Sequence, residues 1–310
     1  MTNILQEIKK YTTIIIHGHK RPDGDCYGGQ YGLKGILKKA FPEKKIFVVG
    51  EESDYVKYVG IPDQINDDIY QNALSIVVDT ATKDRISDAR YTLGNKIIKI
   101  DHHIDVDAYG DMNWVDTTYP AVSEMITDFA VQHNLDIPLE SAIALYTGLI
   151  TDTGRFRYRG VSKRTHTLAG ILIEAGVDVE FIDSKLSKET LKMYALKGYV
   201  YSNFITVEGG FIYLKMPRSI INEYGVTDEE AASVVNLIGG LEGYSVWALM
   251  IEYENEIRIR LRSSGPTINT LAEKYEGGGH AKASGARLPS WEHVDQFTKD
   301  VIKHIKASKE

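Results

Sequence analysis

The chain is poor in cysteine, with Cys26 alone among its 310 residues. One thiol cannot form a disulfide framework, so the fold must depend on a buried core, which a chain of this length can supply. Long apolar runs are also missing. The N-terminal segment has charges before a very short apolar stretch, so we expect neither a signal peptide nor a membrane anchor. Together these absences predict a cytoplasmic protein that contacts no membrane.

Positive charge is scarce as well: 36 Lys and Arg stand against 43 Asp and Glu, and the formal net charge is −7. Stable binding of long nucleic acid depends mainly on basic residues that neutralise phosphates. The composition therefore argues against such a partner. A small anionic ligand stays compatible with it, because a few local cations or metal ions are enough to bind one.

The first half of the chain alternates short apolar runs with helical patterns. This alternation indicates βαβ units, in which a mainly parallel sheet is flanked by helices. Strands are expected at 13–16, 45–49, 74–78 and 96–100, and helices at 31–40, 122–133, 141–150 and 163–175.

The second half begins with a polar helical stretch and then changes to alternating strand patterns, which predicts a smaller α/β domain with a mixed sheet. Its strands are expected at 211–216, 245–253 and 256–262, and its helices at 228–238, 267–274 and 293–305.

The change of pattern suggests a division into two domains, as suits a chain of this length. We expect a first domain over 1–183, a helical linker over 184–204 and a second domain over 205–310.

Candidate metal ligands gather where the apolar runs of the first half end. The run at 13–16 leads into HGHKRPDGD, the run at 74–78 into an aspartate, and the run at 96–100 into DHH. A further aspartate follows the apolar stretch 142–150, and all four groups are expected at strand ends. Because the carboxyl ends of strands meet at one edge of an open α/β sheet, the groups should converge. The six candidates are His19, Asp23, Asp25, Asp79, His102 and Asp152.

The types of side chain indicate which cation would bind. Imidazole and carboxylate without thiolate suit Mn²⁺ or a similar divalent cation better than structural zinc. Six ligands are too many for one ion and enough for two, and two ions about 3.5–4 Å apart can clamp an in-line displacement at phosphorus. Gly24 would let the loop between Asp23 and Asp25 bend so that each carboxylate reaches a different ion.

Each group alone has a simpler explanation. A polar loop or a helix cap would account for HKRPDGD, an N-cap for Asp79, and turn chemistry for Asp152. All four groups in one βαβ domain are hard to explain as turns. Their combination therefore favours a metal centre.

These segments resemble the four motifs of the DHH phosphoesterase superfamily: HGHKRPDGDCYGG, the aspartate at 79, the triplet DHH and TDTGRFRY. The later segment EGGGHAKASGA resembles the glycine-rich signature of the DHH-associated domain. Most of the chain is covered, and together the motifs are similar to the NrnA-type oligoribonucleases and pAp phosphatases. One departure is Cys26-Tyr27-Gly28-Gly29, where the superfamily often has Ala-x-Gly-Ser; it changes no expected ligand.

The resemblance implies a role for each motif residue and an active site in the cleft between the domains. One ion would be held by His19 and Asp23, and the second by Asp25, His102 and Asp152, with Asp79 bridging the two. The catalytic residues would be His103, beside the scissile phosphate, and Asp101, which would orient a histidine ligand.

Substrate-binding candidates lie in the second half. Arg258, Arg260 and Arg262 alternate along an expected strand and so share one face. A solvated face explains Arg258, whereas Arg262, next to Ser264 and the following loop, suits a terminal phosphate. In the family resembled, this segment and the glycine-rich loop face the metal ions. The flexible glycine run would present backbone N–H groups to an anion, which adds Gly278, Gly279 and His280 to Arg262 and Ser264 as substrate-side residues.

The expected activity is hydrolysis of short oligonucleotides by two Mn²⁺ ions. Dinucleotides such as pApA and pGpG would give mononucleotides, and pAp would lose its 3′-phosphate. The expected partners are these small substrates, with no stable complex with long nucleic acid; a homodimer is compatible with the sequence.

Three other readings are kept open. A family II inorganic pyrophosphatase shares the first-half motifs, but the lysine- and arginine-bearing signature of its second domain is not found here. A cyclic-dinucleotide phosphodiesterase usually has membrane and sensor regions, which this chain lacks. A nucleotide-binding module without catalysis would be favoured by a degraded ligand set, yet all six ligands are present.

Overall fold

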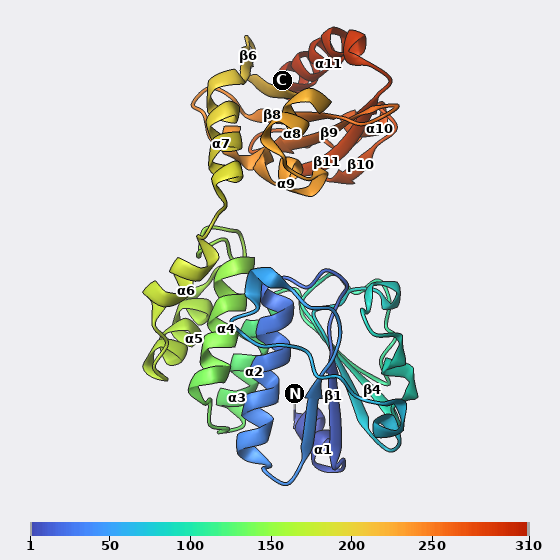
Figure 1. The fold of residues 1–310 in the computed structure, drawn as a ribbon, viewed down its shortest axis with the longest axis vertical. Helices are drawn as coiled ribbons and strands as arrows, with labels where there is room; N and C mark the ends of the chain where they lie inside the picture. Colours follow the sequence, from blue (N-terminus) through green and yellow to red (C-terminus); the bar gives the residue numbers. More distant parts are fainter. Residues whose placement is uncertain (1, 309–310) are drawn as a thin grey trace. The chain divides into compact units, whose positions relative to one another are not determined.

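The computed structural model describes residues 2–308, which form two compact units (Figure 1). The first unit runs to Ser187 and the second begins at Lys188. Among the described residues, no helix combines the length and the apolar character needed to cross a membrane.

A five-stranded sheet forms the centre of the first unit, with strand order β2-β1-β3-β4-β5 and every neighbouring pair parallel. The expected parallel sheet is therefore confirmed, and β5 is an added edge strand. The strands are β1 (Thr13–His17), β2 (Lys45–Val48), β3 (Leu74–Val78), β4 (Lys96–Asp101) and β5 (Met112–Val115).

The two faces of this sheet are covered differently. Helices α2, α3 and α4 pack on one face, where Ile14, Ile76 and Leu145 belong to one continuous apolar core. The other face has a smaller cluster around Ile15 and Tyr70, covered by short 3₁₀ segments. Because both faces are covered, every residue of β3 is buried. The helices are α1 (Thr2–Lys9), α2 (Gly24–Ala40), α3 (Val122–Gln132), α4 (Leu139–Asp152), α5 (Lys163–Glu174) and α6 (Val179–Leu186).

Helix α2 begins earlier than the pattern at 31–40 predicts, directly after the first metal-ligand loop. Asp23 is its N-cap, and the Asp23 side chain accepts hydrogen bonds from the backbone N–H groups of Asp25 and Cys26. A carboxylate at this position satisfies N–H groups that have no partner within the helix. The cap therefore places Asp23 and Asp25 side by side at the carboxyl end of β1.

A six-stranded mixed sheet forms the second unit, with strand order β10-β11-β9-β8-β7-β6. Only β7 and β8 are parallel; the other neighbours are antiparallel. The expected mixed sheet is confirmed. Its strands are β6 (Ile205–Val207), β7 (Phe211–Met216), β8 (Val246–Glu252), β9 (Ile257–Ser263), β10 (Gly278–His280) and β11 (Ala283–Leu288).

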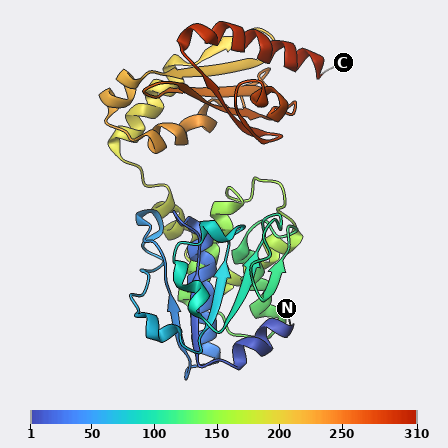
Figure 2. The same cartoon turned by 90° about the vertical axis from the view of Figure 1, so that its right-hand side faces the viewer.

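Alternation along β7 sends side chains to two apolar clusters, one on each face of this sheet. Phe211 packs in a cluster with residues of α11, the long helix that crosses one face of the sheet in Figure 2. Ile212 packs in a second cluster with residues of α7, α8 and α9. The helices are α7 (Leu191–Asn203), α8 (Arg218–Tyr224), α9 (Asp228–Ser233), α10 (Asn269–Glu273) and α11 (Val294–Ala307).

The segment 184–204 differs from the single connecting helix that its polar pattern predicts. Helix α6 ends at Leu186 and α7 begins only at Leu191. Leu196 and Val200 of α7 are buried in the core of the second unit. Because these two apolar side chains need a surface to pack on, α7 is an integral helix of the second unit rather than a linker.

Candidate metal centre

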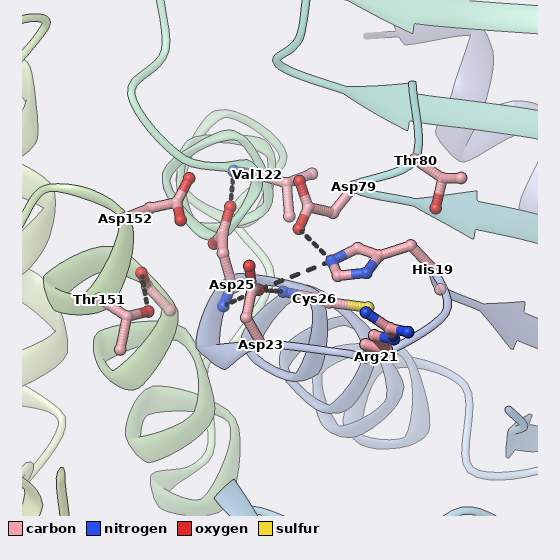
Figure 3. Close-up of polar contacts among 12 residues, drawn as sticks. His19, Arg21, Asp23, Asp25, Cys26, Asp79, Thr80, Val122, Thr151 and Asp152 are labelled. Atoms are coloured by element: carbon pink, nitrogen blue, oxygen red, sulfur yellow. Dashed lines mark hydrogen bonds and ion pairs between the residues drawn. The ribbon is translucent and has the colours of Figure 1, made fainter. Parts of the chain in front are cut away.

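The six expected ligands converge in the first unit. Four of them lie in the loops after β1, β3 and β4 and a fifth, Asp25, in the first turn of α2. Their side chains point toward one another in Figure 3 or lie within contact distance. The sixth, Asp152, differs from the expectation, because it is the last residue of helix α4 and not the end of a strand. Helix α4 packs against α2, and Thr151 near the end of α4 lies against Gly24 at the start of α2, so these two helix ends are neighbours.

Asp79 occupies the middle of the cluster. Its Oδ2 atom lies 3.5 Å from Nε2 of His19, and its Oδ1 atom lies 3.3 Å from Nε2 of His102. The residue is only 2% exposed, and Oδ1 has no hydrogen-bond partner among the described residues. Its backbone is in the left-handed region, with a φ of 51°, which turns the chain sharply after β3. One carboxylate therefore faces both histidines, as a bridging ligand would.

The first of two candidate metal positions is formed by His19, Asp23 and Asp79. Nε2 of His19 lies 3.7 Å from Oδ1 of Asp23 and 3.5 Å from Oδ2 of Asp79. On the other side of the ring, Nδ1 is 2.9 Å from the carbonyl oxygen of Lys20. A hydrogen bond to that carbonyl places a proton on Nδ1 and directs Nε2 toward the cluster.

The second position is formed by Asp25, His102 and Asp152. Nε2 of His102 lies 3.3 Å from Oδ2 of Asp152 and 3.8 Å from Oδ2 of Asp25. The backbone N–H groups of Val122 and Ser123 donate to the Asp25 carboxylate over 2.5 and 2.9 Å. These are the first residues of helix α3, so the N-terminus of that helix holds Asp25 in place.

The charges of the cluster do not balance without a cation. Burial raises the pKa of both Asp25 and Asp152, and the negative charge of Asp79 raises them further. Burial acts in the opposite direction on His102, but the neighbouring carboxylates of Asp152 and Asp79 raise its pKa to about 11. The carboxylates thus retain protons on themselves or on the imidazole, because like charges lie close together in a buried site.

The donor set fits divalent cations. Two groups of side chains each have ligand atoms that all lie within 4.8 Å of one another. One group is Asp79 with His102 and His103, and the other is Asp25 with His102 and Asp152. Oδ1 of Asp79 and Nε2 of His102 are buried without a hydrogen-bond partner among residues 2–308. Buried polar atoms normally have a partner, and divalent cations suit the imidazole and carboxylate donors of this set.

Asp101 contacts a different histidine from the one expected. Its Oδ1 atom lies 2.8 Å from Nδ1 of His103, which is not among the expected ligands, and it also accepts from the His103 backbone N–H. This hydrogen bond raises the pKa of His103. The side chain of His103 is 49% exposed, so its Nε2 edge is accessible to a substrate.

Lys99 lies next to Asp101, and the sequence analysis did not single it out as a site residue. It is fully buried on β4, with Nζ 3.5 Å from Oδ2 of Asp101. Nζ also donates to the carbonyl oxygens of Ala81 and Asp107 over 3.0 and 2.9 Å. A buried cation next to Asp101 favours the ionised carboxylate that holds His103. The sequence feature that could have pointed to Lys99 is a charged residue inside an otherwise apolar strand.

A cavity of about 220 Å³ opens beside the cluster. Its volume suits a phosphate group with its nearest substituents and is smaller than typical pockets for whole ligands. Arg85, which follows β3 in a short 3₁₀ segment, is its one arginine among the described residues, and no motif pointed to it. The lining residues are His19, Asp23, Asp79, Thr80, Ala81, Arg85, His103 and Asp152.

The second unit has its own cavity, of about 790 Å³, on the exposed face of β9 and β11. Arg258, Arg260 and Arg262 line it from β9, so the predicted shared face is correct. Burial, together with the positive charge of Arg260, lowers the pKa of Arg262. Arg258 is paired with Glu256 over 2.6 Å, whereas Arg260 and Arg262 have no carboxylate within ion-pair distance in the part of the chain described.

The glycine-rich segment differs from the flexible loop that its composition predicts. Gly278, Gly279 and His280 form the edge strand β10, paired with β11, and they line the same cavity. A side chain at Gly279 would meet the carbonyl oxygen of Ala283 at 2.8 Å, so glycine permits the close pairing. Ser264 lies just beyond β9, exposed, and its hydroxyl donates to the carbonyl oxygen of Ser245 over 3.4 Å.

Comparison with known proteins agrees with both units. Residues 13–149 match the DHH family, N-terminal domain, and residues 208–307 match the DHHA1 domain. The chain is 38% identical to the bifunctional oligoribonuclease and PAP phosphatase NrnA of Bacillus subtilis, over 97% of each protein. It is 35% identical to the Mycoplasma genitalium protein of the same name, over 98% of each.

A solved structure shows the same fold. The crystal structure of an exopolyphosphatase-related protein from Bacteroides fragilis superimposes with a TM-score of 0.86 at 23% identity, covering 100% of this chain and 97% of the other. The resemblance found in the motifs is thereby confirmed. The chain belongs to the DHH family, with a DHHA1 domain in its second unit, and within that family to the group of the NrnA proteins.

Proposed function

We propose that this protein is a metal-dependent phosphoesterase that hydrolyses short oligonucleotides to mononucleotides and removes the 3′-phosphate of pAp. The observation that carries this proposal is the Asp79-centred cluster, in which six metal-ligand side chains converge beside a cavity of phosphate size. The names of the relatives from Bacillus subtilis and Mycoplasma genitalium state both activities, and those relatives match along almost the whole chain.

Two divalent cations, with Mn²⁺ preferred, would be bound by this cluster. His19 and Asp23 would hold the first, Asp25, His102 and Asp152 the second, and Asp79 both. Imidazole and carboxylate donors together suit Mn²⁺. When bound, such a pair supplies Lewis acidity and an activated water for attack on phosphorus.

His103 would contact the reacting phosphate. Asp101 accepts a hydrogen bond from its Nδ1 over 2.8 Å, which leaves Nε2 as a donor on the exposed edge of the ring. Because Asp101 raises the pKa of His103, the imidazole carries positive charge over a wider pH range. A fixed cation of this kind stabilises the negative charge that develops on the phosphate oxygens. Arg85 adds a second positive charge in the same cavity.

The second unit would bind the end of the substrate that is not cleaved. Arg262 is a partly buried cation beside Arg260, and repulsion between two such cations is relieved by an anion. The edge strand formed by Gly278, Gly279 and His280 has backbone N–H groups that are not used within the sheet, and Ser264 adds a hydroxyl. We assign these residues to a terminal phosphate and the adjoining nucleotide.

Other phosphoesters and phosphoanhydrides are the alternatives. The same ligand set would also act on pyrophosphate or on cyclic dinucleotides, and a binding module without catalysis would need no intact ligand set. The larger cavity of the second unit, with its arginines, favours a nucleotide over pyrophosphate.

The test compares substrates on metal-stripped protein, with and without Mn²⁺: pApA, pGpG, pAp, a long RNA, cyclic di-AMP and pyrophosphate. We expect Mn²⁺-dependent release of mononucleotides from the dinucleotides and of AMP from pAp, with pyrophosphate unchanged. Hydrolysis of pyrophosphate alone would overturn the proposal. Tight binding of pApA without turnover would instead favour the binding module.

A further inference from the structure

Cys26, the one cysteine of the chain, lies in the metal cluster. It belongs to the first turn of α2 and is fully buried. Its sulfur and ligand atoms of His19 and Asp79 all lie within 4.8 Å of one another. Figure 3 shows the Cys26 side chain beneath the imidazole of His19, close to Asp23 and Asp79. This third group of ligand atoms was not expected from the sequence, which placed Cys26 outside the ligand set.

The surroundings of the sulfur are polar. The backbone N–H of Cys26 donates to Oδ1 of Asp23 over 3.1 Å, which fixes the residue in the helix cap. The thiol donates weakly to Oε1 of Gln30 at 3.7 Å. A side-chain carbon at Gly18 would lie 2.3 Å from the sulfur, so glycine leaves the space that the sulfur fills next to His19. A buried cysteine usually packs as a small apolar residue, whereas this one lies among metal ligands.

The carboxylate of Asp79, which this group shares with the second candidate metal position, points to a cation as its partner. Asp79 is 98% buried, since its exposed fraction is 2%; its Oδ2 faces His19, and its Oδ1, which faces His102, has no hydrogen-bond partner among residues 2–308. Nε2 of His19 faces Asp79 and Asp23 at 3.5 and 3.7 Å. Imidazole nitrogen, sulfur and carboxylate oxygen, as in this group of three residues, are donors that zinc accepts.

We propose that the Cys26 sulfur is a ligand for a thiophilic cation at the first position, so that zinc or cadmium binds there more tightly than to nitrogen and oxygen donors alone. Sulfur ligands select such cations over Mn²⁺ and Mg²⁺. On coordination the thiol releases its proton to solvent. This inference rests on the proposed metal centre and adds to it a residue by which the first position discriminates between metals.

Cobalt tests the inference, because Co²⁺ has visible ligand-field bands in any protein site and a near-ultraviolet charge-transfer band only when sulfur is bound. Metal-stripped wild-type protein and Cys26→Ser and Cys26→Ala variants are titrated with Co²⁺. We expect the charge-transfer band in the wild-type protein and only ligand-field bands in the variants. Since no other cysteine exists in the chain, a band that persists in the variants would overturn the proposal.

Competition with a chelator measures selectivity. We expect Cys26→Ser to weaken Zn²⁺ binding about tenfold or more and to leave Mn²⁺ affinity close to that of the wild type. Wild-type protein that binds cobalt without a charge-transfer band overturns the sulfur ligand and leaves the metal centre standing. Failure of the wild type to bind cobalt overturns both. If the variants do not fold, the presence or absence of the charge-transfer band in the wild-type spectrum still shows whether sulfur is bound.

Discussion

Asp79 is the residue that the two candidate metal positions share. Each of its carboxylate oxygens faces a different histidine, at 3.5 Å from His19 and 3.3 Å from His102. Its left-handed backbone conformation, with φ 51°, limits which residues can replace it without strain. Asparagine tolerates this conformation better than most residues, so Asp79→Asn removes the charge while preserving the local backbone.

We expect Asp79→Asn to lower Mn²⁺-dependent hydrolysis of pApA at least about 100-fold, because both positions lose their shared anionic ligand. The variant should keep the circular dichroism spectrum of the wild type. Asp136→Asn, an exposed change of the same charge, is the matched control and should retain full activity. Near-normal turnover by Asp79→Asn would rule out a two-metal centre bridged by this residue.

Metal binding should depend on pH through His102. Burial lowers its pKa, but Asp152 and Asp79 raise it to about 11, so the imidazole is protonated at neutral pH in the metal-free protein. A cation needs Nε2 without its proton, hence binding releases a proton and affinity rises with pH. The expected gain is about tenfold per pH unit for each proton released, between about pH 6 and pH 8.

Calorimetric Mn²⁺ titrations in buffers with different ionisation enthalpies measure both the affinity and the number of protons released. An affinity that does not change with pH would exclude His102 as a ligand.

At the scale of elements, the approach of helix α4 to α2 sets the position of Asp25. Gly148 of α4 lies against Asp25 and Ser123: a side-chain carbon there would be 2.7 Å from Oδ1 of Asp25 and 2.1 Å from Oγ of Ser123. A helix-helix contact thus determines the place of a candidate metal ligand. Gly170 of α5 has open space around it and is a matched control within another helix.

Gly148→Ala should lower the free energy of unfolding by about 1–3 kcal/mol, since the added methyl overpacks the contact. It should also weaken Mn²⁺ binding, because Asp25 must move. Gly170→Ala should raise the free energy of unfolding by about 0.5–1 kcal/mol and leave metal affinity unchanged. Urea unfolding and Mn²⁺ titration measure these effects; wild-type Mn²⁺ affinity in Gly148→Ala would contradict the role given to this contact.

The elements found from the sequence are those with strong apolar patterns. The strand Phe211–Met216 agrees at both ends with the expected 211–216, because its residues are almost all buried and apolar. The strands β5, β6, β10 and β11 were missed. In β11 the buried positions are filled by Ser284, Ala286 and Leu288, so small residues hide the alternation of strand side chains. In β5 no residue is fully buried.

For the whole molecule, each unit has a core of its own. Ile14 and Leu145 belong to the core of the first unit, whereas Phe211 and Val301 belong to a separate core in the second. All six expected metal ligands are in the first unit, which ends at Ser187. Metal binding should therefore stabilise one unit directly.

Calorimetric unfolding should show two transitions, and Mn²⁺ should raise the midpoint of one of them. At a free Mn²⁺ concentration of about 100 times Kd, the stabilisation is about 2.7 kcal/mol by mass action. Arg262 lies in the second unit, so Arg262→Ala should leave the Mn²⁺-induced rise of the midpoint unchanged. The same variant should bind pAp more weakly. A single transition that moves as a whole would show that the two units unfold cooperatively.

The sequence by itself determined the two architectures and the six candidate metal ligands, because donor types and their place after apolar runs can be read without coordinates. Tertiary structure alone decided that Asp101 holds His103, that Lys99 lies behind Asp101, and that the Cys26 sulfur faces His19. These contacts depend on where buried side chains point and on how loops and helices far apart in the chain pack together. Residue type and spacing do not contain that information.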